Sequence, residues 1–511
     1  MTTWTSGYVA DIGYTFGYYA ELNPLRARLA FLNSGLAFPK IETACELGFG
    51  QGLSSNIHAA ASNVQWWGTD FNPAQAAFAQ ELAASAGLNA RLFDEAFAEF
   101  AARPDLPDFD FIGLHGIWSW ISDENRQVIV DFVRSRLKVG GVLYISYNTL
   151  PGWAAFAPMR HLMTEHAEVL GSEGRGIVSR IDGALDFASK LLETNPLFSR
   201  ANPLVADRIN GLKGQNRHYL AHEYFNRDWQ PMHFATMAGW LEPAKLQFAA
   251  SAHYLDQFDA LNLTAEQQAF LADIPDPMFR QSVRDFMVNQ QFRRDYWVKG
   301  ARRLTKLDQT EQIRAQRHVL TTHRPDVSLK VKGSLGEATM NESVYKPILD
   351  CMADHRPRSI GEIQAELADP RIDFVQVLQT IIVLVGAGHV SAVQDLQEAQ
   401  SVRDKVSRIN VALLNRSRGS GDVAHLASAL TAGGISMGWF EQLFLGGVVQ
   451  KAQTATQLAE HAWKLLNNQG QKVLKDGKPL ASNEDNLAEL TRQAEVFILK
   501  KLPLLKALQV I

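Results

Sequence analysis

Short apolar segments alternate with amphipathic segments between residues 41 and 148. The apolar segments are typical of buried strands and lie at residues 41–47, 64–70, 90–94, 109–115 and 141–147. The segments between them have the spacing of helices and lie at residues 53–62, 73–86, 95–102 and 123–138. This alternation predicts an α/β fold in which a Rossmann-like parallel sheet has helices on both faces. Ligands of such sheets bind beyond the carboxyl ends of the strands, so the polar residues there are candidates for a site.

A helix and a strand within residues 231–252 extend this sheet. Pro231 opens a periodic helix, and the run that begins at Leu246 is typical of a strand. Residues 317–322 could pair with that strand and complete the sheet.

The domain boundaries follow from these elements. The first domain is expected at residues 1–325, with helical insertions at about 154–226 and 258–312. The alternative is that residues 205–312 form an independent helical domain.

Residues 326–405 combine a linker with three short helices and a strand, which predicts a winged-helix-like module. Winged helices often read DNA with a basic third helix, but the helix from Phe374 to Val385 contains no lysine or arginine. We therefore expect this module to contact protein, and we expect no nucleic acid partner. Residues 406–511 are predicted to form a mostly helical C-terminal domain.

A glycine loop follows the first strand, with the sequence Glu46-Leu47-Gly48-Phe49-Gly50-Gln51-Gly52. Glycines at alternate positions let the backbone turn sharply and approach a ligand, and the next helix offers free N–H groups. Pyrophosphate sites usually have the pattern G-x-G-x-x-G instead. The carboxylate of Glu46 would repel a pyrophosphate but suits an ammonium group. The alternative is an ordinary turn between strand and helix.

Polar residues at the ends of the next three strands indicate a nucleoside site. Asp70 can accept hydrogen bonds from both ribose hydroxyls, and Phe71 can cover an adenine face. Asp94 can reach the adenine amino group or cap the short helix that follows. Gly116 lets the backbone pass close to a ligand, and the strand-end position of His115 favours a role in the site over a buried structural role.

Aromatic and small residues around these strand ends could line a second pocket, for a molecule that accepts a group transferred from the first ligand. Tyr147, Asn148 and Tyr14 are the candidates for positioning the acceptor group. The other candidates for the pocket are Tyr18, Trp118, Pro151, Trp153, Tyr219 and His222. Simple packing of aromatic residues, and a turn plugged by Trp153, are the alternatives.

Composition narrows the class of protein further. The 511 residues fit about three domains, and the net charge of −4 gives no overall attraction to nucleic acid. The two cysteines, Cys45 and Cys351, lie far apart, so we expect neither a disulfide framework nor a metal site. The N-terminus lacks a signal-peptide pattern, and no run of ~18 apolar residues could insert into a membrane. We expect a cytoplasmic protein.

The acid followed by three glycines resembles motif I of the class I methyltransferases that use S-adenosylmethionine (SAM). The order of the elements resembles the members of this class that carry a methyltransferase regulatory domain, and among these the rickettsial outer-membrane-protein lysine methyltransferases. The stretches that carry this resemblance are residues 14–24, 46–52, 115–120, 147–153 and 219–226.

The resemblance implies SAM as the cofactor and S-adenosylhomocysteine (SAH) as its product. The residues expected to bind the cofactor are Glu46, Gly48, Phe49, Gly50, Gly52, Asp70, Phe71, Asp94, His115 and Gly116. The resemblance also suggests that the methyl acceptor is a lysine on a protein surface and that the protein forms homodimers.

Two other functions stay open at this stage. The chain could methylate a nitrogen or oxygen of a small molecule, or it could bind SAM as a regulatory protein without turnover. Methylation of exocyclic amines in DNA is disfavoured, because the fourth strand ends in His115-Gly116-Ile117-Trp118 and lacks the Asn/Asp-Pro-Pro-aromatic motif of those enzymes.

Overall fold

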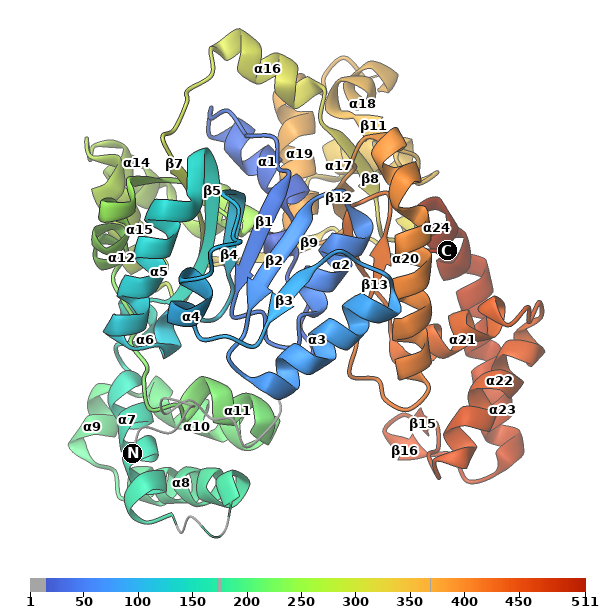
Figure 1. The fold of residues 1–511 in the computed structure, drawn as a ribbon, viewed down its shortest axis with the longest axis horizontal. Helices are drawn as coiled ribbons and strands as arrows, with labels where there is room; N and C mark the ends of the chain where they lie inside the picture. Colours follow the sequence, from blue (N-terminus) through green and yellow to red (C-terminus); the bar gives the residue numbers. More distant parts are fainter. Residues whose placement is uncertain (1–14, 172–173, 175, 368) are drawn as a thin grey trace.

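A seven-stranded sheet forms the centre of the molecule, in the order β3-β2-β1-β4-β5-β7-β6 (Figure 1). A computed structural model describes residues 15–171, 174, 176–367 and 369–511. The strands are β1 Thr43–Leu47, β2 Gln65–Thr69, β3 Arg91–Phe93, β4 Phe109–Leu114, β5 Leu137–Asn148, β6 Leu246–Ser251 and β7 Phe292–Lys299. The first five are parallel, and β7 runs antiparallel between β5 and β6. The prediction of a Rossmann-like α/β sheet is confirmed.

The helices that alternate with these strands also lie where the sequence predicts them. They are α1 Pro24–Asn33, α2 Leu53–Ala61, α3 Pro73–Ser85, α4 Phe97–Ala101 and α5 Asp123–Arg136. Asn23 and Asn72 cap α1 and α3 with their side chains, and a proline follows each as the first helical residue. These caps explain why both helices begin where they do.

Neighbouring residues along each strand point to opposite faces of the sheet and enter different cores. Trp66 and Phe111 face the core that contains α1, whereas Trp67 and Ile112 face the core that contains α5. Both faces of the sheet are therefore buried, as the nearly continuous apolar runs of its strands predict.

The strand that pairs with β6 is β7, so the predicted pairing of residues 317–322 with residues 246–252 is wrong. The expected helical insertion at 258–312 accordingly contains a strand of the central sheet, along with α13 Asp259–Asn262, α14 Ala265–Ala272, α15 Pro277–Met287 and α16 Lys306–Arg314. The charged residues of β7 explain the error. Arg293 and Asp295 are nevertheless buried, because they pair with each other and Arg293 also pairs with Asp285.

The insertion between β5 and α12 (Phe234–Leu241) is helical, as predicted. It consists of α6 Leu150–Trp153, α7 Ala157–Val169, α8 Gly176–Glu193, α9 Leu197–Ala201, α10 Leu204–Lys213 and α11 Arg217–Tyr224. These helices share a core of their own, and Figure 1 shows them below the sheet, on the side where β5 continues into α6. We call residues 150–224 the helical insertion.

Residues 317–392 form a smaller unit with its own sheet. Here β8 (Arg317–Leu320) pairs antiparallel with β11 (Arg358–Ser359) and β12 (Val390–Ala392). The helices of this unit are α17 Glu342–Cys351, α18 Ile360–Glu366 and α19 Phe374–Gly386. Their order agrees with the predicted helices and strand, and the winged-helix assignment stays a prediction.

The C-terminal part is mostly helical, as predicted. Its helices are α20 Leu396–Ser417, α21 Trp439–Val449, α22 Ala455–Asn468, α23 Asn483–Val496 and α24 Leu502–Ala507. A hairpin of β13 (His425–Ser428) and β14 (Gly433–Ser436) lies between α20 and α21. Figure 1 shows α20 beside α2 and α3, and apolar residues of α2 belong to the core of this part. Among the described residues, no helix combines the length and apolar character that crossing a membrane requires.

Candidate functional site

The glycine loop between β1 and α2 has a backbone that requires glycine. Gly48, Gly50 and Gly52 have φ angles of 73°, 57° and 65°, in the left-handed region that side chains disfavour. A Cβ on Gly48 would clash with the side chain of Ile117, and one on Gly52 would lie 2.5 Å from Cβ of Ala79. The loop therefore brings bare backbone to the carboxyl end of the sheet.

This loop forms one wall of a cavity at the carboxyl ends of the strands. Seven of the predicted cofactor-binding residues line the cavity: Gly48, Phe49, Gly50, Asp70, Phe71, His115 and Gly116. The structure thus brings together residues from the ends of β1, β2 and β4, as expected for a ligand site at the switch point of an α/β sheet.

Asp70 connects the glycine loop to the end of β2. Its carboxylate accepts hydrogen bonds from the backbone N–H of Gly50 at 2.8 Å and of Asn72 at 3.0 Å. Burial nevertheless raises the pKa of Asp70 to about 7, because these two bonds offset only part of the desolvation. The carboxylate is placed to accept further hydrogen bonds from a ligand's hydroxyl groups.

Glu46 lies behind the loop and does not line the cavity. Its side chain is buried and accepts a hydrogen bond from the hydroxyl of Ser55 on α2. Burial raises the pKa of Glu46 to about 8, and the nearby charge of Asp70 adds to this effect. Gly52, which begins α2, also lies outside the lining.

His115 and Gly116 form the wall opposite the loop. Gly116 has a φ of 66° and donates its N–H to the hydroxyl of Ser146 at 2.8 Å. The Nδ1 of His115 lies 2.7 Å from the hydroxyl of Tyr144, and burial lowers the pKa of His115 to about 4. The imidazole is therefore neutral at pH 7 and does not repel a cation.

The ring of Tyr19 stacks on that of His115, with a centroid distance of 3.6 Å and an interplanar angle of 19°. Thr15, Gly17 and Tyr19 all line the cavity. The aromatic segment at the start of the described chain therefore covers the site through Tyr19. This residue was not among the predicted site residues.

The charged residues of the cavity are acidic. Among the described residues that line it, Asp70, Glu95 and Asp228 carry carboxylates and none is lysine or arginine. Glu95 forms an ion pair with Arg103 at 2.6 Å through Oε1, while its Oε2 is buried without a hydrogen-bond partner among the described residues. A cavity with this lining favours a ligand that is positively charged or donates hydrogen bonds.

Asp94 is exposed and lies outside the cavity. The following residue, Glu95, takes the place that the sequence assigned to Asp94. At the end of β3 the cavity is thus lined by Glu95, one position after the predicted Asp94.

The two described candidates for positioning an acceptor lie at the end of β5, behind the cavity wall. Tyr147 is fully buried and donates its hydroxyl to Asp295 at 2.9 Å. Asn148 is also buried, and its Nδ2 has no partner among the described residues. The third candidate, Tyr14, falls outside the described residues.

The predicted acceptor pocket is dispersed over three places. Trp118 is fully buried against the core that contains α5, and Tyr18 faces the C-terminal part. Trp153 packs in the core of the helical insertion, on the same short helix α6 as Pro151. Tyr219 and His222 lie on α11, where Tyr219 is 39% exposed and His222 is buried. None of these six residues lines the cavity.

Other residues that sequence reasoning missed complete the lining. They come from the glycine loop, α3, the start of α4, the turn η2 (Trp118–Trp120), the start of α5 and the loop after α11: Gln51, Gln75, Ala96, Phe97, Ile117, Trp120, Ile121, Ser122, Asn125 and Asp228. The position of Asp228 places the loop that follows the helical insertion at the mouth of the cavity.

Three comparisons with known proteins agree with this geometry. A family described as "predicted methyltransferase regulatory domain" matches residues 216–299, which include Asp228. An uncharacterised protein of Synechocystis is 40% identical over 511 residues, which cover 99% of each chain. An uncharacterised protein of Rickettsia prowazekii is 25% identical over 290 residues, which cover 55% of this chain and 51% of that protein.

Among solved structures, PKMT2 from Rickettsia typhi in complex with AdoHcy shares the fold over nearly its whole length. The TM-score is 0.68, and the match covers 98% of this chain and 100% of that chain at 17% identity. At this level of identity the comparison concerns the fold.

Proposed function

We propose that the chain is a class I methyltransferase that binds SAM and methylates lysine side chains of a protein substrate, because residues 216–299 match the methyltransferase regulatory domain and nearly the whole chain shares the fold of PKMT2. The observation that carries this proposal is the acidic cavity beside the glycine loop. Its carboxylates suit a sulfonium cofactor and an amine acceptor, which are both cationic before the reaction.

The residues present fit this cofactor. Gly48 and Gly50 line the cavity in the left-handed region without a side chain, which supports close approach of a ligand to their backbone. Asp70 is placed to accept the ribose hydroxyls, and the unpartnered Oε2 of Glu95 to accept the adenine amino group. Phe71 and Phe97 provide apolar surface beside them.

The bound cofactor supplies an electrophilic methyl group, which a neutral amine attacks in line. The residues of this chain have to position the amine and to lower its pKa, so that its proton passes to water before the attack. An isolated lysine has a pKa of about 10.4 and is almost wholly protonated at pH 7. Trp120 and Ile121 at the mouth of the cavity exclude water and so lower the pKa of an amine that enters.

The acceptor side of the site is assigned to Asp228 and Asn148. Asp228 attracts the approaching ammonium group, because it is the carboxylate contributed by the loop after the helical insertion. Asn148 is buried next to this region with its Nδ2 unpartnered among the described residues, and we assign it the positioning of the acceptor from behind the cavity wall. The neutral imidazole of His115 does not oppose either interaction.

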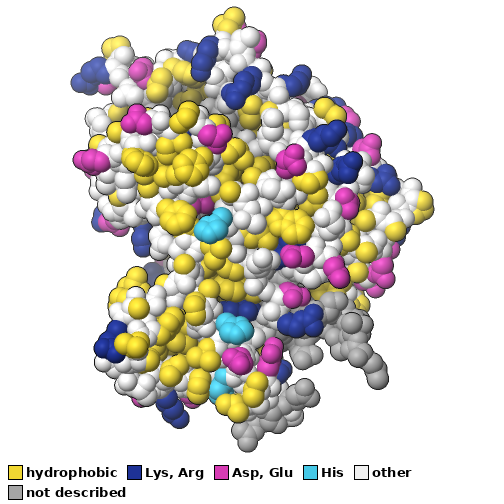
Figure 2. Space-filling model, turned by 90° about the vertical axis from the view of Figure 1, so that its left-hand side faces the viewer, with side chains coloured by type: hydrophobic (Ala, Val, Ile, Leu, Met, Phe, Trp, Pro, Cys, Tyr) yellow, Lys and Arg dark blue, Asp and Glu magenta, His cyan; other side chains and the backbone are white. Residues whose placement is uncertain are grey.

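A protein acceptor is favoured over a small molecule by an exposed apolar surface of the molecule. Figure 2 shows hydrophobic side chains gathered on the face that carries α14, α15 and the helical insertion. Phe270, Phe279 and Phe286 are 58–64% exposed on α14 and α15. Exposed apolar patches of this kind commonly mark surfaces that bind proteins.

Transfer of labelled methyl groups tests the proposal. The protein is incubated with methyl-labelled SAM and either a protein lysate or a small-molecule extract, with the Asp70→Ala variant as a control. We expect label in protein bands that yield methyllysine on hydrolysis, and none with the variant. Label only in small molecules would overturn the acceptor assignment, and SAM binding without any transfer would indicate a regulatory protein.

A further inference from the structure

The segment from Thr15 to Leu22, which we call the strap, separates the cofactor cavity from the C-terminal part. Its side chains alternate between the two sides. Thr15, Gly17 and Tyr19 line the cavity, whereas Phe16 and Tyr18 contact the opposite side. This alternation is that of an extended chain, in which successive side chains point in opposite directions.

Tyr18 rests on the hairpin of β13 and β14. Its ring lies 4.8 Å from that of His425, between centroids, and a Cβ on Gly434 would come within 3.0 Å of the ring. A Cβ on Gly433 would lie 2.5 Å from the hydroxyl oxygen of Tyr18. Gly433 and Gly434 therefore leave the space that the ring of Tyr18 occupies, and a side chain at either position would fill it. We call these two glycines the glycine seat.

Two further contacts join the strap region to the C-terminal part. Phe16 packs between Phe78 of α3 and the guanidinium of Arg416 on α20, which lies 4.3 Å from the ring centroid. Asn23, directly after the strap, donates its Nδ2 to the carbonyl of Thr431 at 3.1 Å. The C-terminal part thus holds the strap at three positions.

The hairpin is in turn held by residues 508–510. Ser428 donates its hydroxyl to the carbonyl of Leu508 at 2.6 Å, and Ala429 donates its N–H to the carbonyl of Gln509 at 3.2 Å. The Nδ2 of Asn410 on α20 donates to the carbonyl of Val510 at 2.8 Å. A continuous set of contacts therefore leads from residue 510 through the hairpin to the strap.

On the cavity side, the strap places Tyr19 over His115. The N–H of Tyr19 donates to the hydroxyl of Ser54 on α2 at 2.9 Å, and a Cβ on Gly17 would clash with the ring of Tyr19. A second cavity lies between the strap and the C-terminal part, lined by Tyr18, Glu21 and Asn23. The strap thus has space behind it at Tyr18, whereas its end is held by the central sheet through an ion pair between Glu21 and Arg294 at 2.7 Å. Residues 16–18 are the part that the C-terminal contacts hold in place.

We infer that Tyr18 and its glycine seat are positioning elements for cofactor binding, through which the C-terminal part holds the strap and Tyr19 against the cofactor. This inference rests on the proposed function and deepens it, because it gives the C-terminal part a role in retaining the cofactor. Tyr18 acts through Tyr19 and does not itself touch the cofactor cavity.

SAH binding to the full-length protein tests this inference. Tyr18→Ala is expected to raise the Kd for SAH about tenfold, mainly through faster dissociation, and Tyr18→Phe to restore it because the ring is kept. Asn23→Ser keeps a residue that can cap α1 but loses the contact with Thr431, and is expected to raise the Kd two- to fivefold. Affinity is measured by calorimetry and the dissociation rate by stopped flow.

Phe444→Ala provides the matched control. Phe444 is buried in the same C-terminal core and packs on Phe497, so its truncation destabilises this part without touching the strap. Its Kd for SAH should match that of the unchanged protein.

Each outcome separates the two hypotheses. If the unchanged protein fails to bind SAH, the proposed function is wrong and the inference falls with it. If it binds SAH and Tyr18→Ala binds equally well, only the inference is overturned. If Tyr18→Ala does not fold, Asn23→Ser decides, and an unchanged Kd and dissociation rate in that variant overturn the inference.

Discussion

Two regions of the molecule bury carboxylates in opposite ways. Beside the glycine loop, Glu46 and Asp70 have no cationic partner among the described residues that contact them, and burial raises their pKa values to about 8 and about 7. At the end of β6, the carboxylate of Asp256 is only partly buried, and the hydrogen bond from His253 and the nearby charge of Arg284 outweigh desolvation and lower its pKa.

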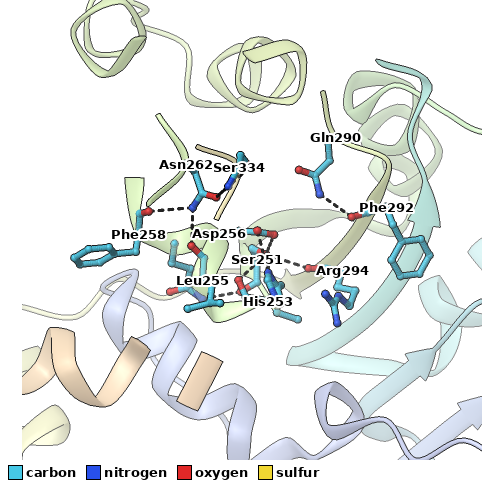
Figure 3. A network of polar contacts seen from close by, with 12 residues as sticks. Ser251, His253, Leu255, Asp256, Phe258, Asn262, Gln290, Phe292, Arg294 and Ser334 are labelled. Atoms are coloured by element: carbon cyan, nitrogen blue, oxygen red, sulfur yellow. Dashed lines mark hydrogen bonds and ion pairs between the residues drawn. The ribbon is translucent and has the colours of Figure 1, made fainter. Parts of the chain in front are cut away.

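The second region is a polar network with dense pairing (Figure 3). Ser251 bonds to Asp256 at 3.1 Å, and His253 lies 3.0 Å from the same carboxylate. Nearby, the hydroxyl and N–H of Ser334 both donate to Oδ1 of Asn262, which ties the hairpin of β9 (Lys330–Gly333) and β10 (Gly336–Thr339) to residues 259–262. We call residues 251–262 with Ser334 the β6 network.

This difference separates a site from a structural element. A buried carboxylate that is already paired contributes to the stability of the fold. A buried carboxylate without a cation costs stability in the free protein and gains its partner when a ligand binds. The loop carboxylates are therefore expected to control ligand affinity, and the β6 network to control stability.

The largest expected effect is on ligand affinity. Asp70→Ala removes the acceptor for two ribose hydroxyls and should weaken SAH binding about 100-fold, or about 2.7 kcal/mol. Asp94→Ala is the matched control, because Asp94 is exposed at the next strand end and lies outside the cavity. Calorimetry would measure both, and equal affinities for the two variants would contradict the assignment of the cofactor site.

The next effect concerns the β6 network. Asp256→Ala leaves Ser251 and His253 without their shared acceptor and should lower the free energy of unfolding by about 2 kcal/mol. SAH affinity should stay unchanged, because this network lies outside the cavity. Urea denaturation with and without SAH would show both quantities. If Asp256→Ala bound SAH more weakly but unfolded at the same free energy, the proposed difference between the two regions would be wrong.

The pH dependence sharpens the same contrast. Ionised Asp70 accepts ribose hydroxyls best, and with a pKa of about 7 its ionised fraction rises about tenfold between pH 6 and pH 8. SAH affinity should therefore rise by up to about tenfold over this range. In Asp70→Ala the change of affinity with pH should be smaller. An affinity for SAH that does not change between pH 6 and pH 8 would contradict this role of Asp70.

Stability should change with pH in opposite directions for the two regions. Glu46 and Asp70 have pKa values above those of the unfolded chain, so their contribution is present below about pH 4 and is lost as the pH rises through 7 and 8. Asp256 has a lowered pKa, so its contribution is present above about pH 4 and is lost on acidification. Thermal unfolding without ligand at pH 3, 6 and 8 would show both losses.

The smallest expected effect is at Glu95. Glu95→Gln replaces the acceptor for the adenine amino group and should weaken SAH binding three- to fivefold, or about 0.7–1 kcal/mol. Asp94→Asn should leave the affinity unchanged, since that side chain points to solvent. A loss with Asp94→Asn and none with Glu95→Gln would reverse the assignment of the two acids.

The sequence predicts those parts of the site that depend on backbone position. The glycine loop, Asp70 and His115 follow from the positions of strand ends, which short apolar runs mark clearly. The direction of a side chain at a strand end changes with a shift of one residue. The sequence does not show this shift, so it pointed to Asp94, whereas Glu95 lines the cavity. At the end of β5, Tyr147 likewise turns to Asp295 on β7, a strand that the sequence did not predict.

The strand β7 was missed for a physical reason. Its sequence contains Arg293, Arg294 and Asp295, and a run of charged residues is usually solvated. In the fold, Arg293 pairs with Asp285 and Asp295, and Arg294 pairs with Glu21. Asp285 lies on α15 and Glu21 is distant in sequence, so the local pattern shows only the pairing of Arg293 with Asp295 and not that the charges can be buried.

The contacts that hold the strap also set an order of events during synthesis of the chain. The strap leaves the ribosome early, but its seat at Gly433 and Gly434 and the supporting contacts of residues 508–510 follow about 410–490 residues later. At ~5–20 residues per second, the delay to residue 510 is about 25–100 s. A nascent chain with a folded sheet would thus still lack the contacts that hold the strap, so tight cofactor binding would develop only after residue 510 has been added.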